Sequence, residues 1–280
     1  MSMQKQPIPS VEEGNKSRLE TTAKVQFGSG RFATAFQIAR VSNPMLTTVP
    51  ETITTLVVRP LLGALLLVAV LGSVGVTDLR DAAYASIVLS FGMAVMLGAV
   101  MHVSSDRMRG VSQEIIGYGL WNPPYWTSKL LIPMILGIIP AVLSSLVIFW
   151  ISGSDDLTAL LRVMTLIPIA ALVGALIGIT AAITSFALSD PYMVSNILDS
   201  VIMITAGVVL PLQFYPTWLA WIARFLPFTA LVEAVRSTGP IWPFALRELA
   251  IAVVWLLAGI LIARRVMSLV RSGERIEEIW

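Results

Sequence analysis

The chain has 280 residues, of which 56% are hydrophobic and only 13% are charged, and its net charge is +2. Soluble domains carry about 25% charged residues, so this composition excludes a soluble globular enzyme and indicates a polytopic membrane protein. The absence of cysteine excludes disulfides, thiolate metal ligands and cysteine nucleophiles. The single histidine, His102, excludes zinc motifs that need several histidines.

The N-terminal part of the chain is polar and precedes the apolar runs. Residues 1–28 are rich in Ser, Glu, Lys and Gln, and they are predicted to form a disordered tail because they cannot bury a core. Phe32, Phe36 and Ala39 then recur at helical spacing between two arginines. This spacing predicts a short amphipathic helix that lies in the headgroup layer of a membrane.

Long runs without any ionisable side chain follow, including 132–153, 163–189 and 200–223. A helix needs about 20 apolar residues to cross a bilayer, and only a helix pairs all its backbone groups within one such segment. The pattern predicts six transmembrane helices, at about 54–75, 83–103, 130–151, 163–188, 193–213 and 246–266.

The segment between the fifth and sixth spans has a character of its own. Pro216 and Pro227 enclose a helix-prone stretch that contains Trp218 and Trp221 and is too short to cross a bilayer. Tryptophan at this density is typical of the membrane interface. The predicted fold is therefore an all-α membrane protein with six transmembrane helices, an interfacial N-terminal helix and a re-entrant helical hairpin before the last span.

The distribution of basic residues predicts the orientation. With the N-terminus inside, the inner segments carry 14 Lys and Arg residues and the outer segments carry 5. The positive-inside rule then places both termini in the cytoplasm. The predicted organisation is a disordered cytoplasmic tail at 1–28, a six-span transmembrane domain at 29–266 and a cytoplasmic C-terminal tail at 267–280.

Two segments of the sequence carry a family pattern. The first has charged residues at 106–109, Gly110, a polar stretch, then Asn122-Pro123-Pro124-Tyr125-Trp126 and Lys129. The second consists of Ala206 to Leu212, Tyr215 to Leu219, Leu226 to Phe228 and Val232 to Arg236. The first resembles the first cytoplasmic loop of type-2 ABC exporter permeases. The second is similar to the signature around span five in daunorubicin-resistance-type permeases, and the resemblance covers roughly residues 31–266.

The resemblance implies a permease subunit of an ATP-driven exporter in a prokaryotic plasma (inner) membrane. Its cargo would be a hydrophobic or amphipathic compound, such as a drug, a lipid or a natural product. Two permease subunits, identical or different, would each sit on a separate ABC ATP-binding subunit. No GxxxxGK[ST] sequence occurs in the chain, so ATP and Mg are expected on that partner. We expect contacts with membrane lipids, but no nucleic acid, metal site or cofactor on this chain.

The inner loop at 107–118 is the candidate for contact with the ATP-binding subunit. By pattern alone a polar loop of this length is equally compatible with a solvated linker. The resemblance implies the coupling role, in which a short polar helix fits a groove on the partner and charges set its direction. The coupling residues predicted in this way are Arg107, Arg109, Gly110, Gln113 and Glu114.

The predicted fifth span carries the candidate transport path, since the resemblance implies that spans two and five line it. Leu210 and Leu212 flank Pro211, where an apolar plug would close the outer exit. Asp199 is an intramembrane carboxylate, which is a functional hypothesis by default. The alternative is that Asp199 lies near the inner interface and reaches water or a backbone N–H.

The predicted fourth span contains a pattern of small residues. Gly174 and Gly178 form a GxxxG pattern in this span, which favours close packing within one subunit over a dimer seam.

Two other protein classes are alternatives to the exporter. A secondary transporter not powered by ATP would need inverted repeats with ionisable midplane residues, and neither is evident. An intramembrane enzyme would need paired catalytic groups, which only Asp199 and His102 approach. No catalytic residue is therefore assigned.

Overall fold

The computed structural model describes residues 79–108, 110, 123–151, 156–185, 188, 190–208 and 210–271, with scattered positions between 53 and 73. The predicted N-terminal tail, the amphipathic helix at 31–40 and the C-terminal tail beyond 271 lie outside these residues. Most of the predicted first span lies outside them as well.

The described residues form helices and no strand, which confirms the all-α class for this part of the chain. The elements are α5 (Leu79–Met108), α7 (Pro123–Ile151), α8 (Leu157–Ser185), α9 (Met193–Thr205), the short 3-10 helix η3 (Leu212–Phe214), α10 (Thr217–Phe225), α11 (Thr229–Arg236) and α12 (Trp242–Arg271).

Four of these helices are long and apolar enough to cross a membrane: Leu79–Met108, Lys129–Ile151, Leu157–Ser185 and Trp242–Arg265. They correspond to the predicted second, third, fourth and sixth spans, and each begins one to six residues before the predicted start. Helices α10 and α11 are long and apolar enough to cross a membrane only when they are taken together, and they are bent by 106° at the break between them. Such a pair is either a broken span or a re-entrant loop, so the re-entrant hairpin stays a prediction.

The predicted fifth span at 193–213 is wrong as a single helix. Helix α9 has only 13 residues and ends at Thr205, where the Ala206 N–H donates to the Ile202 carbonyl. Gly207 follows with a left-handed φ of 81°, which takes the chain out of the helix. At 1.5 Å per residue α9 reaches about 20 Å, which is short of the ~30 Å hydrocarbon core. The uninterrupted apolar run hid this break from the sequence pattern.

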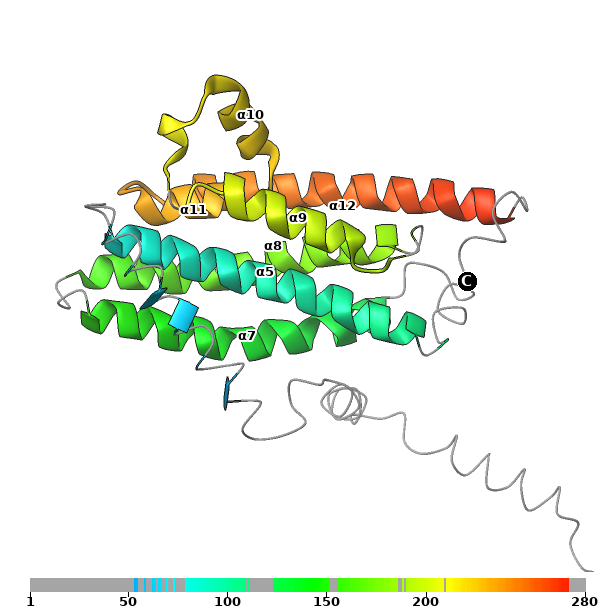
Figure 1. Ribbon diagram of the computed structural model, residues 1–280, viewed down its shortest axis with the longest axis horizontal. Coiled ribbons are helices and arrows are strands. Elements are labelled where there is room, and N and C mark those ends of the chain that lie inside the picture. The colour runs from blue at the N-terminus through cyan, green and yellow to red at the C-terminus, as the bar shows by residue number, and fades with distance from the viewer. Residues whose placement is uncertain are drawn as a thin grey trace, which may run out of the picture.

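The helices form an elongated bundle in which α5 and α8 are the central pair (Figure 1). Each long helix contains an apolar stretch of 18 residues. The buried share of this stretch is 67% in α5 and 78% in α8, but only 28% in α7 and 22% in α12. The two outer helices therefore present large apolar side chains, such as Trp150 and Leu257, to the surroundings. Helix α10 projects away from the bundle beside α9 (Figure 1).

Small residues bring α5 and α8 into close contact. A Cβ at Gly174 would overlap the carbonyl oxygen of Gly92, and a Cβ at Gly178 would lie 2.7 Å from the Cβ of Ala99. Both glycines of the GxxxG pattern thus face α5 of the same chain, which confirms the prediction of packing within one subunit.

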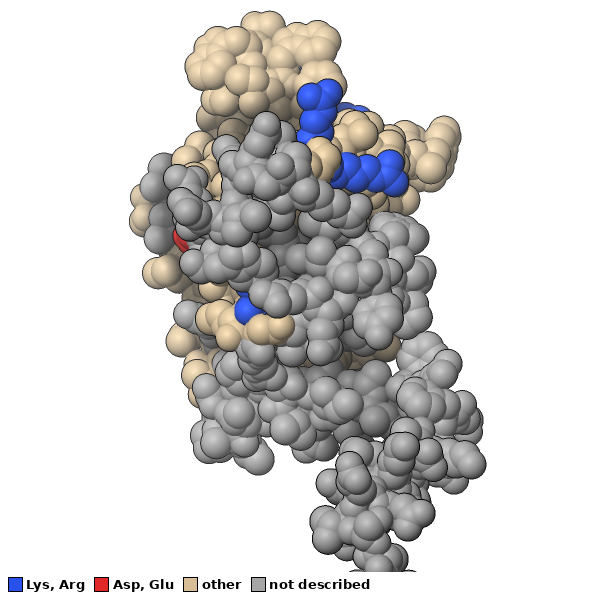
Figure 2. Space-filling view, turned by 90° about the vertical axis from the view of Figure 1, so that its right-hand side faces the viewer, with Lys and Arg blue, Asp and Glu red and all other residues tan. Residues whose placement is uncertain are grey.

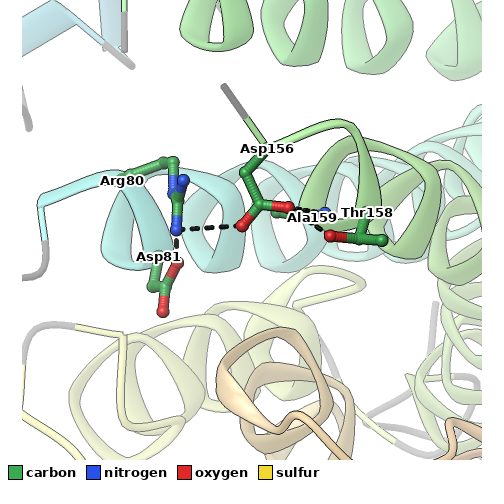
Figure 3. A network of polar contacts seen from close by, with 5 residues as sticks. All are labelled: Arg80, Asp81, Asp156, Thr158 and Ala159. Carbon is green, nitrogen blue, oxygen red and sulfur yellow. Dashed lines mark hydrogen bonds and ion pairs between the residues drawn. The ribbon is translucent and has the colours of Figure 1, made fainter. Parts of the chain in front are cut away.

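Polar residues at the ends of α5 explain why this helix is longer than the predicted 83–103. At its first turn, the Arg80 guanidinium lies 3.2 Å from Asp156 and also pairs with Asp81 (Figure 3). Asp156 is the N-cap of α8 and accepts from Thr158 Oγ1 and from the N–H of Ala159 at 3.0 Å. The Thr158 hydroxyl, and then the Ala159 N–H, lower the pKa of the Asp156 carboxyl. These contacts join the starts of α5 and α8.

Candidate functional site

At the opposite end of the bundle, the last turn of α5 holds two neighbouring helices. Lys129 in the second turn of α7 donates to Asp106 Oδ1 at 2.9 Å and lies 2.8 Å from the second carboxylate oxygen. Both side chains are mostly buried, with 20% and 13% exposed, so the pair is shielded from solvent screening. Because residues 109–122 connect α5 to α7, this ion pair holds the two helices together close to that connection.

Arg107 makes the second connection at this end. Its Nη1 donates to the carbonyl of Ser185 at 3.0 Å and to that of Leu188 at 2.8 Å. Ser185 is the last residue of α8, and the last four carbonyls of a helix have no partner within it. The cation therefore satisfies two carbonyls and complements the negative end of the helix dipole. The structure thus shows the predicted coupling residue Arg107 contacting α8; contact with an ATP-binding subunit stays a prediction.

The remaining coupling residues are only partly described. Gly110 has a left-handed φ of 76°, and its N–H donates to the Arg107 carbonyl at 3.0 Å, which ends α5 as C-terminal glycines commonly do. Arg109, Gln113 and Glu114 lie outside the described residues. Figure 2 looks onto this end of the bundle, where basic side chains are visible in more places than acidic ones on the residues not drawn in grey.

Helix α9 begins at this end and has one buried and one exposed face. Ser195, Leu198, Ile202 and Thr205 point into the bundle. The opposite face is mixed, because Asn196 and Ser200 are exposed alongside large apolar residues, and Asp199 is half-exposed at its edge. Amide, hydroxyl and carboxylate groups are costly against lipid tails. This face is therefore suited to water or to another polar protein surface.

Beyond α9 the chain forms an apolar hollow of about 350 Å³. It is lined by Met203, Ile204, Leu210, Phe214, Tyr215, Pro216 and Leu219. The break that creates it is fixed by Arg236, whose guanidinium donates to the carbonyls of Gly207 and Val208. The structure thus brings the exposed end of α9 and the start of α10 together around one apolar space.

The structure separates the three predicted gate residues. Leu210 is 46% exposed and lines the hollow, whereas Leu212 is 7% exposed and packs against Gly207. Pro211 precedes η3 with an extended backbone. Leu210 and Leu212 therefore do not share one surface within a single chain, and a plug made by both at a two-fold axis stays a prediction.

Glu248 is the residue that the sequence analysis missed. It lies in the first third of α12 with 0% exposure, and its carboxylate accepts from the N–H groups of Phe228 and Ala230, the latter at 2.9 Å. These groups belong to the N-terminus of α11, where a carboxylate also complements the helix dipole. The sequence did contain a signal for this residue. Glu248 is the only carboxylate between Glu233 and Glu274, and it lies inside the predicted sixth span.

Further contacts hold α11 in place. Phe228 has the only left-handed φ, 73°, among the described residues other than glycine. Its ring fits against Gly92 of α5, where any Cβ would overlap it. Arg162 of α8 donates to the carbonyls of Ala234 and Gly239, the former at 2.7 Å. Helix α11 is therefore anchored to the bundle, in contrast to the projecting α10.

Within the described residues, no three His, Cys, Asp or Glu side chains lie close enough together to hold a metal ion. His102 is buried in the last two turns of α5. Asp199 lies on α9, the helix that begins beyond the turn held by Arg107. The charged end of the bundle therefore lies at the start of α9, the mixed face lies along α9, and the apolar hollow lies beyond its other end.

Comparison with known protein families gives a match. The family described as the ABC-2 type transporter matches residues 34–238. This range includes every described helix from α5 to α11. No curated protein matches the chain.

Proposed function

This chain belongs to the ABC-2 type transporter family, and we propose that it is the permease subunit of an ATP-driven exporter of the daunorubicin-resistance type. The family match over 34–238 carries this proposal, because it places three of the four helices that are long enough to cross a membrane, α5, α7 and α8, in one domain with the mixed face of α9. A membrane permease of an ABC transporter needs an energy source on another chain, since no phosphate-binding loop sequence occurs here.

The proposed cargo is a hydrophobic or amphipathic compound that is moved outward. Support comes from the apolar hollow beside α9, whose lining includes Met203, Leu210 and Phe214. Flexible methionine side chains adapt to hydrophobic ligands of different shape, and aromatic side chains commonly line the pockets that bind them. The mixed face with Asn196, Asp199 and Ser200 offers polar groups to the remainder of such a compound.

The proposed partners are an ABC ATP-binding subunit below the inner loop and a second permease subunit. The Asp106–Lys129 ion pair joins α5 and α7 close to the loop. A displacement of the loop by the ATP-binding subunit would therefore move the ends of these two helices. A second permease subunit, identical or different, would cover the mixed face of α9 across a water-filled path. Asp199 then lies beside the path, and Leu210 with Pro211 and Leu212 lies near its outer exit.

The proposed topology has six spans, a re-entrant hairpin before α12 and both termini in the cytoplasm of a prokaryotic cell. The alternation of α5, α7, α8 and α12 (Figure 1) is compatible with it, since α5, α8 and α12 all end at the side where α7 begins. The basic bias of 14 to 5 Lys and Arg residues supports the inward direction of that side.

Single cysteines in this cysteine-free chain test the topology. An impermeant maleimide applied to intact cells should label cysteine at Ser154 or Thr238 and should leave cysteine at Ser17 unlabelled until the cells are opened. Labelling efficiency is read on a gel against total label in permeabilised cells. Labelling of Ser17→Cys in intact cells, with none at Ser154→Cys and Thr238→Cys, would reverse the orientation.

A charge reversal in the inner loop tests the function. Glu114→Arg should leave membrane insertion unchanged, because Glu114 lies outside the apolar runs that enter the membrane. It should weaken binding of the ATP-binding subunit by about tenfold, which corresponds to ~1.4 kcal/mol. Binding is measured by co-purification of a subunit that hydrolyses Mg-ATP, identified by mass spectrometry, and by vanadate-sensitive hydrolysis in vesicles.

Glu277→Arg is the matched control, since it makes the same reversal in the C-terminal tail and should bind and hydrolyse like the parent. If the parent chain purifies without any ATP-hydrolysing subunit, the exporter proposal fails. If Glu114→Arg retains the subunit and its hydrolysis at the parental level, the contact assignment fails and the exporter proposal stands.

A further inference from the structure

The last turn of α5 contacts both the inner loop and the turn that leads into α9. On the loop side, Arg107 lies three residues before Gly110, which closes the helix. On the other side, its guanidinium holds the carbonyls of Ser185 and Leu188 at 3.0 and 2.8 Å. These charge-assisted hydrogen bonds join elements that are 78 and 81 residues apart in the sequence.

The turn between α8 and α9 is itself closed by hydrogen bonds. The Leu188 N–H donates to the Ser185 carbonyl at 3.1 Å, and the Tyr192 N–H donates to Asp190 Oδ1 at 2.8 Å. Ser195 Oγ then donates to the Tyr192 carbonyl at 2.9 Å, inside the first turn of α9. Leu188 lies five residues before Met193, the first residue of α9, so a displacement of Leu188 acts on α9 through a short connection.

We propose that Arg107 is a positioning residue that passes movement of the inner loop to α9, through the carbonyls at the end of α8. This inference rests on the proposed function, and it differs from a contact between Arg107 and the ATP-binding subunit. The direction follows from the geometry. Movement of the loop displaces the last turn of α5, and the Arg107 guanidinium moves the α8–α9 turn together with it. Helix α9 then rotates, so that its mixed face changes orientation.

A single reporter cysteine on α9 tests this proposal without knowledge of the cargo. Ser200 is exposed, so Ser200→Cys introduces a small change and the only thiol in the chain. The intact complex with its ATP-binding subunit is purified, and maleimide labelling is timed with and without ATP and vanadate. In the parent background, trapping should change the labelling rate at this cysteine by about fivefold or more.

Three variants separate transmission from fold and from binding. Arg107→Gln removes the charge and the Nη1 donor that holds both carbonyls. It should abolish the ATP-dependent change in labelling while the ATP-binding subunit stays bound and traps vanadate. Arg107→Lys keeps the charge and donors for both carbonyls, so it should restore most of the change. Arg265→Gln, an exposed arginine on α12 at the same end, should respond like the parent.

Each remaining outcome overturns one specific statement. If Arg107→Gln loses the ATP-binding subunit, Arg107 is a binding contact and the transmission proposal is wrong. If Arg107→Gln keeps the full ATP-dependent change, with or without a lower melting temperature, Arg107 has a structural role alone. If the parent complex contains an ATP-hydrolysing subunit but Ser200→Cys does not respond to trapping, α9 does not move and the inference fails. If no such subunit is present, the proposed function fails first.

Discussion

Gly174→Leu should destabilise the permease by about 3 kcal/mol, because overpacking a closely packed site forces backbone movement. A Cβ at this position already overlaps the carbonyl oxygen of Gly92 and lies 3.1 Å from the Cβ of Val95. The first obstacle is backbone, which cannot rotate away as a side chain can. The central helices α5 and α8 would have to separate, and with them the core of the bundle.

Thermal unfolding of the detergent-solubilised chain measures this effect. The matched control is Gly63→Leu, since a Cβ at Gly63 meets nothing within 4 Å. It should melt close to the parent temperature. Equal melting temperatures for the Gly174 and Gly63 variants would show that α5 and α8 are not in the close contact described above.

Glu248→Leu should be more damaging still, with a loss of about 4 kcal/mol, because two buried backbone N–H groups lose their acceptor at ~1–3 kcal/mol each and the cap of α11 is removed. The two groups are the N–H of Phe228 and that of Ala230. Phe228 also holds a left-handed backbone conformation that costs free energy in itself. Without the carboxylate, the N-terminus of α11 should open.

Hydrogen exchange at the Phe228 and Ala230 amides reads the effect directly, beside the melting temperature. Glu248→Gln should be intermediate, because its amide keeps one acceptor oxygen and turns an NH₂ group toward the other donor. Glu233→Leu is the control on α11 itself. It removes a half-buried ion pair with Arg247, so it should cost about 1 kcal/mol or less. Parental protection of both amides in Glu248→Leu would exclude the capping role.

The long crossing helices were predictable because their signal is local. Long, predominantly apolar segments predicted the helices that became α5, α7, α8 and α12, and those of α7 and α8 contain runs with no charged side chain. The ends were less predictable. Residues 79–82 and 104–108 are polar enough to be predicted as loops, yet they are helical. Arg80 pairs with Asp156, the N-cap of α8, and Asp106 pairs with Lys129 of α7.

The fifth span shows where the local signal fails. Its apolar run continues through Gly207 to Leu212, so hydropathy predicts one helix to 213. The left-handed Gly207 and the Arg236 guanidinium on the carbonyls of Gly207 and Val208 end it early. That arginine lies nearly 30 residues further along the chain, and no window of sequence around α9 contains it.

The sequence by itself determined that this protein is a helical membrane protein, that the four helices α5, α7, α8 and α12 are long enough to cross, and that Gly174 and Gly178 pack closely within one chain. These properties follow from side chains that act alone or at a fixed helical spacing. Only the tertiary structure decided the tasks of Arg107, Arg236 and Glu248. Each of these charged groups meets backbone atoms of a distant helix end, and which helix end comes within reach depends on how the whole bundle packs.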